Sequence, residues 1–229
     1  MTELVVVGEG QTEERFVRQL LAPTLAELAV YATSRVLRTS RGAGGGALTT
    51  DRVLHQLPRI LKERDDMYVA TFFDLYGLAP DFPGLSATAG LSDPLERAAA
   101  VEAAFRDTVV AVTGCRPSRF VPHIQPYEFE ALLLADPKAF ARVNPQWQSA
   151  EGKLATIVGA TSSPEHVNDG VNTHPSARIR QHLPGYRKVG HGVAVAAAIG
   201  LDRIRAECRH FAEWFGRMQA LPPLGRAGP

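Results

Sequence analysis

Residues 4–14 read Leu-Val-Val-Val-Gly-Glu-Gly-Gln-Thr-Glu-Glu, and this stretch decides the fold class. The continuous apolar, β-branched run that opens it is typical of a buried parallel strand. Gly8-Glu9-Gly10 ends the strand in a tight turn, and Thr12 is expected to cap the helix that follows. Glu13 and Glu14 fall in the first helical turn, where the helix dipole favours acids. The order strand, turn, helix predicts the first half of a β-α-β unit.

The same alternation continues along the chain. Further strands are expected over residues 31–38, 67–73 and 120–124, and helices over residues 53–61, 93–112 and 127–134. The helix at Asp93 has the clearest start, with an acidic cap followed by Pro94 and Glu96. Its predicted apolar stripe consists of Leu95, Ala98, Val101, Phe105, Val109 and Val112. This order predicts an α/β fold with a mostly parallel sheet flanked by helices.

The second half of the chain has a different character. No strand is expected after about residue 145, where short helical pieces alternate with Pro, Gly and His. We therefore expect an α/β core over residues 1–145, a C-terminal helical appendage packed on that core over residues 146–220, and a flexible tail over residues 221–229. The net charge of +1 divides into −4 for residues 1–114 and +5 for residues 115–229, so an acidic core carries a basic appendage.

Composition excludes several classes of protein. The two cysteines, Cys115 and Cys208, form no CxxC pair, which excludes a cysteine-rich zinc site and a disulfide framework. The N-terminus lacks the pattern of a signal peptide, and no apolar run approaches the roughly 20 residues that a membrane span requires. A cytoplasmic protein with no membrane partner is the expectation.

Acidic residues follow three of the predicted strands, where open α/β sheets bind ligands. Glu9 follows the first strand, Asp74 follows the strand over residues 67–73, and Glu128 and Glu130 follow the strand over residues 120–124. Carboxylates that converge on one edge repel one another unless a cation neutralises them, and an all-oxygen cluster suits Mg²⁺ or Mn²⁺. Such a site suits phosphoryl-transfer chemistry.

These acids also have structural interpretations. Nothing structural requires an acid at Glu9, which lies between two glycines. Asp74, by contrast, could stabilise a turn or cap a helix, and Glu13 could stabilise its helix through the helix dipole. Glu128 and Glu130 are two residues apart, so on one helix at most one of them would point into a given site.

Basic residues of the appendage are candidates for phosphate contacts. Arg178, Arg180, Arg187 and Lys188 could neutralise a nucleic-acid backbone, although a solvated basic face would explain them nearly as well. Four histidines are candidates for proton transfer or phosphate contact, with His191 favoured because it lies between two glycines near Lys188; the others are His123, His174 and His182.

Residues 7–13, Val-Gly-Glu-Gly-Gln-Thr-Glu, resemble the opening Glu motif of TOPRIM domains, the module of topoisomerases, primases and OLD-type nucleases. More specifically, the chain resembles the domain-of-unknown-function 4276 family of TOPRIM-like bacterial proteins. The matching stretches are residues 67–77, 125–136, 167–170, 175–176 and 183–192. Their common order and spacing extend the resemblance over most of the chain.

The resemblance implies roles for particular residues. Glu9 would be the first metal-binding acid, and Glu130 would be the later acid, with Glu128 as second choice and Glu13 as a further ligand. Asp74-Leu75-Tyr76 matches the Asp-x-Asp motif with its second Asp replaced by Tyr, which puts two-metal binding in doubt. Lys188 resembles the basic residue that TOPRIM nucleases place near the scissile phosphate.

Three hypotheses follow. The first is a Mg²⁺- or Mn²⁺-dependent nuclease of DNA or RNA, with Glu9, Asp74, Glu130, Lys188 and His191 in its catalytic site. For this hypothesis the resemblance implies a role in bacterial anti-phage defence beside an ATPase partner, and a homodimer is also considered. The second is a non-catalytic TOPRIM-like module that binds nucleic acid or acts as an adaptor for the ATPase. The third is hydrolysis of a small phosphoester in a pocket of His and Arg.

Overall fold

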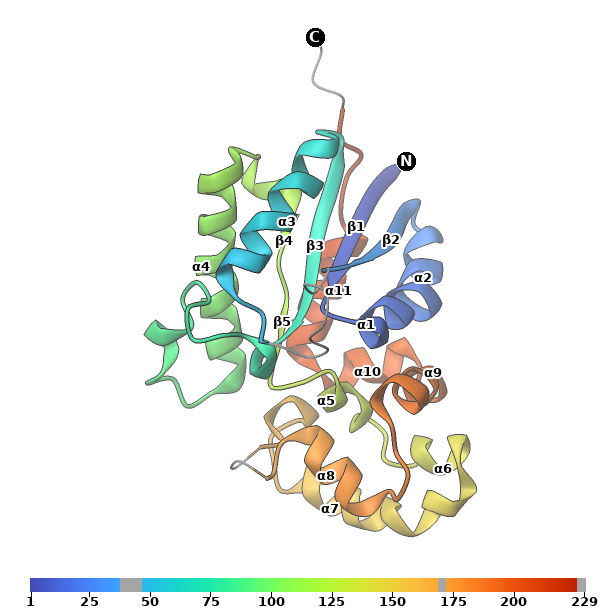
Figure 1. Cartoon of the computed structure of the whole chain (residues 1–229). Coiled ribbons are helices and arrows are strands. Elements are labelled where there is room, and N and C mark those ends of the chain that lie inside the picture. The colour runs from blue at the N-terminus through green and yellow to red at the C-terminus, as the bar shows by residue number, and fades with distance from the viewer. Residues whose placement is uncertain (38–46, 169–171, 226–229) are drawn as a thin grey trace.

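The computed structural model describes residues 1–37, 47–168 and 172–225 and has an α/β fold (Figure 1). Its sheet is parallel, with the strand order β2-β1-β3-β4 and with β5 also pairing with β3. The strands are β1 (Thr2–Gly8), β2 (Val30–Val36), β3 (Met67–Asp74), β4 (Phe120–Val121) and β5 (Ile124–Gln125). The central strands β1 and β3 are covered on both faces, which explains their continuous apolar sequences.

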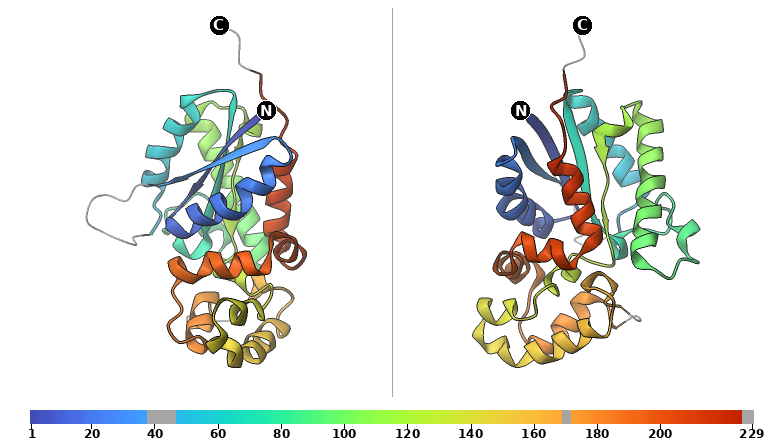
Figure 2. Two further views of the ribbon diagram at one scale, coloured as in Figure 1. Left: turned by 90° about the vertical axis from the view of Figure 1, so that its right-hand side faces the viewer. Right: turned by 180° about the vertical axis from the view of Figure 1, so that it is seen from behind.

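Helices cover both faces of this sheet (Figures 1 and 2). One face packs against α3 (Thr50–Glu63) and α4 (Pro94–Thr113), and receives Val5 and Val7 from β1. The other face receives Leu4 and Val6 and packs against helices from both ends of the chain. These helices are α1 (Gln11–Phe16), η1 (Val17–Leu21), α2 (Ala22–Ala26) and α11 (Arg209–Gln219).

The remaining helices gather beyond the carboxyl ends of the strands, at the lower side of Figure 1. They are α5 (Glu130–Leu133), α6 (Ala139–Val143), α7 (Glu151–Gly159), α8 (Pro175–His182), α9 (Val193–Ile199) and α10 (Leu201–Glu207). Short 3-10 turns occur at η2 (Leu75–Gly77), η3 (Ser86–Thr88), η4 (Pro117–Arg119), η5 (Pro145–Ala150) and η6 (Pro164–His166), and η7 (Lys188–Gly192) is a π-helical turn. In the described part of the chain no strand follows β5, as the sequence predicts.

Most element predictions are confirmed. Asp93 caps α4, because its Oδ1 accepts hydrogen bonds from the backbone N–H groups of Leu95 and Glu96. The strand predicted over residues 31–38 is β2, although residue 38 lies outside the described residues. Residues 226–229 of the predicted tail also lie outside them. Leu221 and Pro222, at the start of that tail, accept hydrogen bonds through their carbonyl groups from Thr2 Oγ1 and Tyr68 OH.

Four details of the prediction are wrong. The strand over residues 120–124 is interrupted at Pro122 and His123, because proline has no N–H to donate to a neighbouring strand. The helix expected from Tyr127 begins at Glu130, since Tyr127 has a left-handed φ of 59°. Gly10, not Thr12, is the N-cap of α1, because the helix already begins at Gln11. Val112, on the predicted stripe of α4, is exposed.

No helix among the described residues is long and apolar enough to cross a membrane.

Candidate functional site

Five charged side chains meet at the carboxyl ends of β1 and β3, and we call them the rim cluster. They are Glu9 in the turn after β1, Glu13 in the first turn of α1, Asp74 at the end of β3, Glu130 at the start of α5, and Lys188 at the start of η7. The parallel register places Gly8 of β1 beside Phe72 of β3, so both strands end at the same edge. The topology therefore assembles Glu9, Asp74 and Glu130 of the acids that the sequence predicts to converge.

Lys188 is the hub of the rim cluster. Its Nζ lies 2.8 Å from Asp74 Oδ2, 3.4 Å from Glu130 Oε2 and 3.5 Å from Glu13 Oε1. The same ammonium lies 5.9 Å from the centre of the Phe129 ring. One positive charge thus faces carboxylates from three different segments of the chain, and the cluster retains an excess of acids.

Backbone hydrogen bonds hold Glu9 and Asp74 in place. Glu9 Oε1 accepts a hydrogen bond of 2.7 Å from the backbone N–H of Asp74, which joins the ends of β1 and β3. Asp74 Oδ1 accepts a hydrogen bond of 2.8 Å from the backbone N–H of Phe129, while its other oxygen faces Lys188. Asp74 therefore connects the sheet, the segment before α5 and η7.

Two glycines allow the close packing around these acids. A β-carbon on Gly77 would lie 2.5 Å from Glu9 Oε2, so a side chain at this position would displace the carboxylate. A β-carbon on Gly8 would lie 2.7 Å from Glu13 Cβ, which explains the need for glycine where β1 turns into α1. The role of Gly8 fits the predicted tight turn, whereas that of Gly77 depends on a contact across the fold.

The acids of the rim cluster are difficult to ionise together. Burial, reinforced by the charge of Asp74, raises the pKa of Glu9 to about 8. Burial also raises the pKa of Glu130 to about 7 and raises the pKa of Glu13, although Lys188 opposes both shifts. Burial disfavours the ammonium of Lys188, but Asp74, Glu130 and Glu13 raise its pKa well above the ordinary value. Additional positive charge would therefore be favourable here.

Glu130 is a buried acid whose hydrogen-bonding capacity is unused among the described residues. Its side chain is 1% exposed, and neither of its oxygens accepts a hydrogen bond from the described residues. A buried carboxylate in this state is unfavourable unless a cation or a proton compensates it. The all-oxygen donor set of Glu9, Glu13, Asp74 and Glu130 fits Mg²⁺ or Mn²⁺.

The acids around Lys188 do not form a preassembled ion cage. Among the described residues, one group of three His, Cys, Asp or Glu side chains offers ligand atoms within 4.8 Å of one another, and that group lies elsewhere, at Glu102, His123 and His210. A metal ion at the rim cluster would require the carboxylates to shift from their present contacts with Lys188.

Some predicted residues lie outside the rim cluster. Glu128 precedes α5 and faces α8, where its oxygens lie 2.8 Å from His174 Nδ1 and accept a hydrogen bond of 3.0 Å from the backbone N–H of Ser176. His191 Nδ1 accepts a hydrogen bond from the backbone N–H of Arg187, and its ring packs edge-on against Trp147. Both residues thus connect parts of the helical region.

The predicted phosphate-binding arginines lie near η7 and along α8. Arg187 directly precedes Lys188 and is exposed, as is Arg180, whereas Arg178 is half-buried. Of the other predicted histidines, His182 is half-buried at the end of α8 and His123 is fully buried beside the sheet. Tyr76 packs against Tyr127, and its hydroxyl accepts a hydrogen bond from the side chain of Asn168.

Comparison with known proteins gives one match. A family model described as "Domain of unknown function (DUF4276)" matches residues 8–219, which cover the sheet, the rim cluster and the C-terminal helices. No curated protein and no solved structure matches the chain.

Proposed function

The chain belongs to the DUF4276 family, and we propose that it is a metal-dependent nuclease that hydrolyses phosphodiester bonds of DNA or RNA at the rim cluster. One observation carries this proposal: three carboxylates face a single ammonium at the carboxyl edge of a parallel sheet, and a fourth, that of Glu9, accepts a hydrogen bond from the backbone of Asp74 beside them. Open α/β sheets bind their ligands at this edge. The excess of buried acid favours a cationic cofactor.

Glu9, Asp74 and Glu130 would hold Mg²⁺ or Mn²⁺, with Glu13 as a further ligand. Such an ion polarises a phosphate and lowers the pKa of bound water, which is the chemistry that phosphodiester hydrolysis needs. The raised pKa values of Glu9 and Glu130 agree with this assignment, since a cation would favour their ionised forms. The hydrogen bonds from Asp74 N–H and Phe129 N–H orient the carboxylates of Glu9 and Asp74.

Lys188 would stabilise negative charge on the phosphate. Its long side chain is one-third exposed, so its ammonium can reach both the carboxylates and a substrate at the edge of the site. Arg187 lies beside it, and Arg178 and Arg180 of α8 would contact neighbouring phosphates of the backbone. This arrangement gives the basic half of the chain a role in holding nucleic acid.

The resemblance to TOPRIM nucleases supports the same activity. It also extends the proposal to bacterial anti-phage defence, in which an ATPase protein would be the partner. A homodimer of the chain is part of the same proposal. In such a defence system the chain would be the nuclease component, and the rim cluster would be the site that cleaves nucleic acid.

The direct test is cleavage of labelled DNA and RNA with Mg²⁺, Mn²⁺ or excess chelator. We expect metal-dependent cleavage by the wild-type chain and a loss of at least 100-fold in Glu9→Gln and Asp74→Asn, because each change removes a charged ligand. Circular dichroism would show that both variants remain folded. Cleavage by both variants at the wild-type rate would contradict the assignment of the site.

The contacts of Lys188 also favour a second candidate function. The chain would then be a non-catalytic module that binds nucleic acid or acts as an adaptor. The ammonium of Lys188 already neutralises part of the acidic cluster, and Tyr76 replaces the second Asp of the TOPRIM motif. In that case the rim cluster would be a structural salt-bridge network. The adaptor would bind nucleic acid or an ATPase equally well with and without divalent metal, which separates it from the nuclease.

A further inference from the structure

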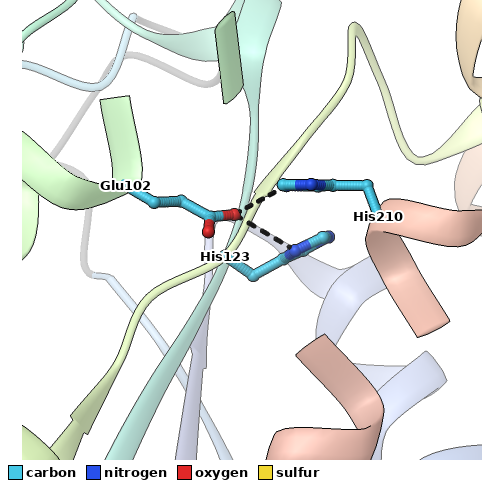
Figure 3. A group of neighbouring side chains, drawn as sticks. All are labelled: Glu102, His123 and His210. Atoms are coloured by element: carbon cyan, nitrogen blue, oxygen red, sulfur yellow. Dashed lines mark hydrogen bonds and ion pairs between the residues drawn. The ribbon is translucent and has the colours of Figure 1, made fainter. Parts of the chain in front are cut away.

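A second polar cluster lies at the sheet edge, between α4 and α11. Figure 3 shows its three members: Glu102 from α4, His123 from the break between β4 and β5, and His210 from the first turn of α11. Glu102 Oε1 lies 2.8 Å from His210 Nε2 and 3.4 Å from His123 Nδ1. All three residues are buried, and His123 is fully inaccessible to solvent.

Neighbouring hydrogen bonds determine which nitrogen of His123 carries its proton. Glu165 accepts hydrogen bonds from the backbone N–H groups of His210 and Phe211, at 2.9 and 3.1 Å, so it is an acceptor at the start of α11. The side-chain nitrogen of Gln125 also donates to Glu165, and Gln125 Oε1 therefore faces His123 Nε2, at 3.1 Å. An amide oxygen only accepts, so Nε2 of His123 must be the protonated nitrogen.

This assignment leaves the lone pair of His123 Nδ1 directed at a carboxylate oxygen. Nδ1 makes no hydrogen bond with the described residues, and the atom it faces, Glu102 Oε1, already accepts a hydrogen bond of 2.9 Å from the backbone N–H of Ile124. Two acceptors that face each other in a buried site repel. A cation bound to both atoms would turn this repulsion into attraction.

We propose that Glu102, His123 and His210 form a binding site for a transition-metal ion, with Zn²⁺ as the expected occupant. Two imidazoles and one carboxylate are a ligand set that zinc uses in proteins. Ligands of a tetrahedral zinc ion with bonds of about 2.0–2.1 Å lie roughly 3.3 Å apart, close to the 3.4 Å between Glu102 Oε1 and His123 Nδ1. The 2.8 Å hydrogen bond between Glu102 Oε1 and His210 Nε2 would lengthen as zinc replaces the proton on Nε2. Gln125 orients the ring of His123 through its other nitrogen, as second-shell partners of metal-binding histidines do.

The site is also reachable from solvent. A cleft of about 520 Å³ is lined by Glu102 and His210 together with Arg106, Glu213 and Arg217. Arg217 Nη2, from a residue that lines this cleft, lies 3.4 Å from Glu102 Oε2. An ion can therefore enter, and its fourth coordination position can be taken by water or by an anion that the arginines attract.

Metal analysis of the full-length chain tests this proposal. After dialysis against a chelator, titration with Zn²⁺ in excess Mg²⁺, which would occupy the rim cluster, should show one equivalent bound, and Co²⁺ should give the visible spectrum of a tetrahedral protein complex. Glu102→Gln and His210→Gln should each reduce the affinity at least 10-fold. Two control variants should still bind one equivalent of Zn²⁺. They are His55→Gln, which removes an exposed histidine, and Glu9→Gln, which alters the rim cluster.

A measurement on the wild-type chain keeps the test independent of folding defects in the variants. Nitrogen NMR of the imidazoles should show metal-free His123 protonated at Nε2 and should show its Nδ1 signal shift when Zn²⁺ is added. A proton on Nδ1, together with imidazole signals that Zn²⁺ leaves unchanged, would overturn the proposal and identify the cluster as a structural hydrogen-bond network.

Discussion

Lys188 Nζ lies 2.8 Å from Asp74 Oδ2, although 114 residues separate the two in the sequence. This ion pair joins the basic half of the chain to the carboxyl end of the central strand β3. The same ammonium also faces Glu13 and Glu130, so one side chain from the helical region completes a site whose acids come from the α/β core.

Replacing Lys188 by Met should impair both stability and cleavage. The change leaves Asp74, Glu13 and Glu130 without their cation, and we expect a loss of about 2 kcal/mol in the metal-free protein, after allowance for solvent screening of the partly exposed lysine. Cleavage should fall by about 100-fold, the typical effect of removing one charge-stabilising group. Chemical denaturation and a cleavage assay measure the two effects.

Lys153→Met is the matched control, because Lys153 is an exposed lysine on α7. It should leave both quantities unchanged. If Lys188→Met were as stable and as active as this control, the ammonium would have no role in the rim cluster.

The stability of the metal-free protein should fall as the pH rises. Burial raises the pKa of Glu9 from 4.5 to about 8 and that of Glu130 to about 7. Between pH 4.5 and 8 the folded chain therefore binds more protons than the unfolded chain, so the free energy of unfolding decreases across this window. Thermal melts in chelator, compared with melts in Mg²⁺, measure the effect, and Mg²⁺ should reduce the loss.

Glu9→Gln separates this effect from general alkaline destabilisation. Glutamine can still accept the hydrogen bond from Asp74 N–H but carries no charge, so at pH 8.5 the variant should be about 2 kcal/mol more stable than wild type, or roughly 4–8 °C in Tm. At pH 4 the two proteins should melt together. Equal melting at both pH values would show that Glu9 is not a buried, uncompensated acid.

Gly77→Ala should weaken metal binding through Glu9. The added β-carbon would lie 2.5 Å from Glu9 Oε2, so either the carboxylate or the η2 turn must move. A displaced carboxylate should lower the affinity for Mn²⁺ by about 10-fold. This is the smallest loss typical of mutations in residues that position a metal ligand. Gly90→Ala is the matched control, since a β-carbon there would contact nothing within 4 Å. Identical Mn²⁺ affinities in the two variants would show that the close approach of Gly77 does not position Glu9.

Glu130→Gln and Glu128→Gln should have different effects. Glu130 faces Lys188, and its loss should abolish metal-dependent cleavage, whereas Glu128 binds His174 and Ser176 and should be needed for stability more than for the reaction. A cleavage assay combined with thermal melts distinguishes the two variants. A larger loss of cleavage in Glu128→Gln would reverse the assignment of the later acid.

Local sequence patterns predict the strands, the main helices and the edge at which acids gather, because apolar periodicity and helix caps depend on near neighbours. They predict that Glu9, Asp74 and one of Glu128 and Glu130 converge, because parallel strands end at a common edge, and the choice of Glu130 comes from the family resemblance. They fail at Tyr127, whose left-handed backbone delays α5, since this conformation depends on packing and not on local preference.

Contacts between distant segments are harder to predict. The resemblance to TOPRIM nucleases suggests Lys188, but its geometry with Asp74 and Glu13 depends on the whole path of the helical region. Gly77 and the backbone N–H of Phe129 were missed because neither offers a chemical group that a sequence pattern would identify. Glu102 and His210 were missed for another reason: together with His123 they come from three elements with no recognisable spacing.

Titration of Mn²⁺ into the chelator-treated protein at pH 8, followed by calorimetry, tests the central claim most directly. We predict binding in the millimolar range or tighter by the wild-type chain, loss of this binding in Asp74→Asn, and its retention in His210→Gln, which alters only the second cluster. Absence of Mn²⁺ binding in wild type, or equal binding by folded Asp74→Asn, would contradict a metal site at the rim cluster and favour the adaptor.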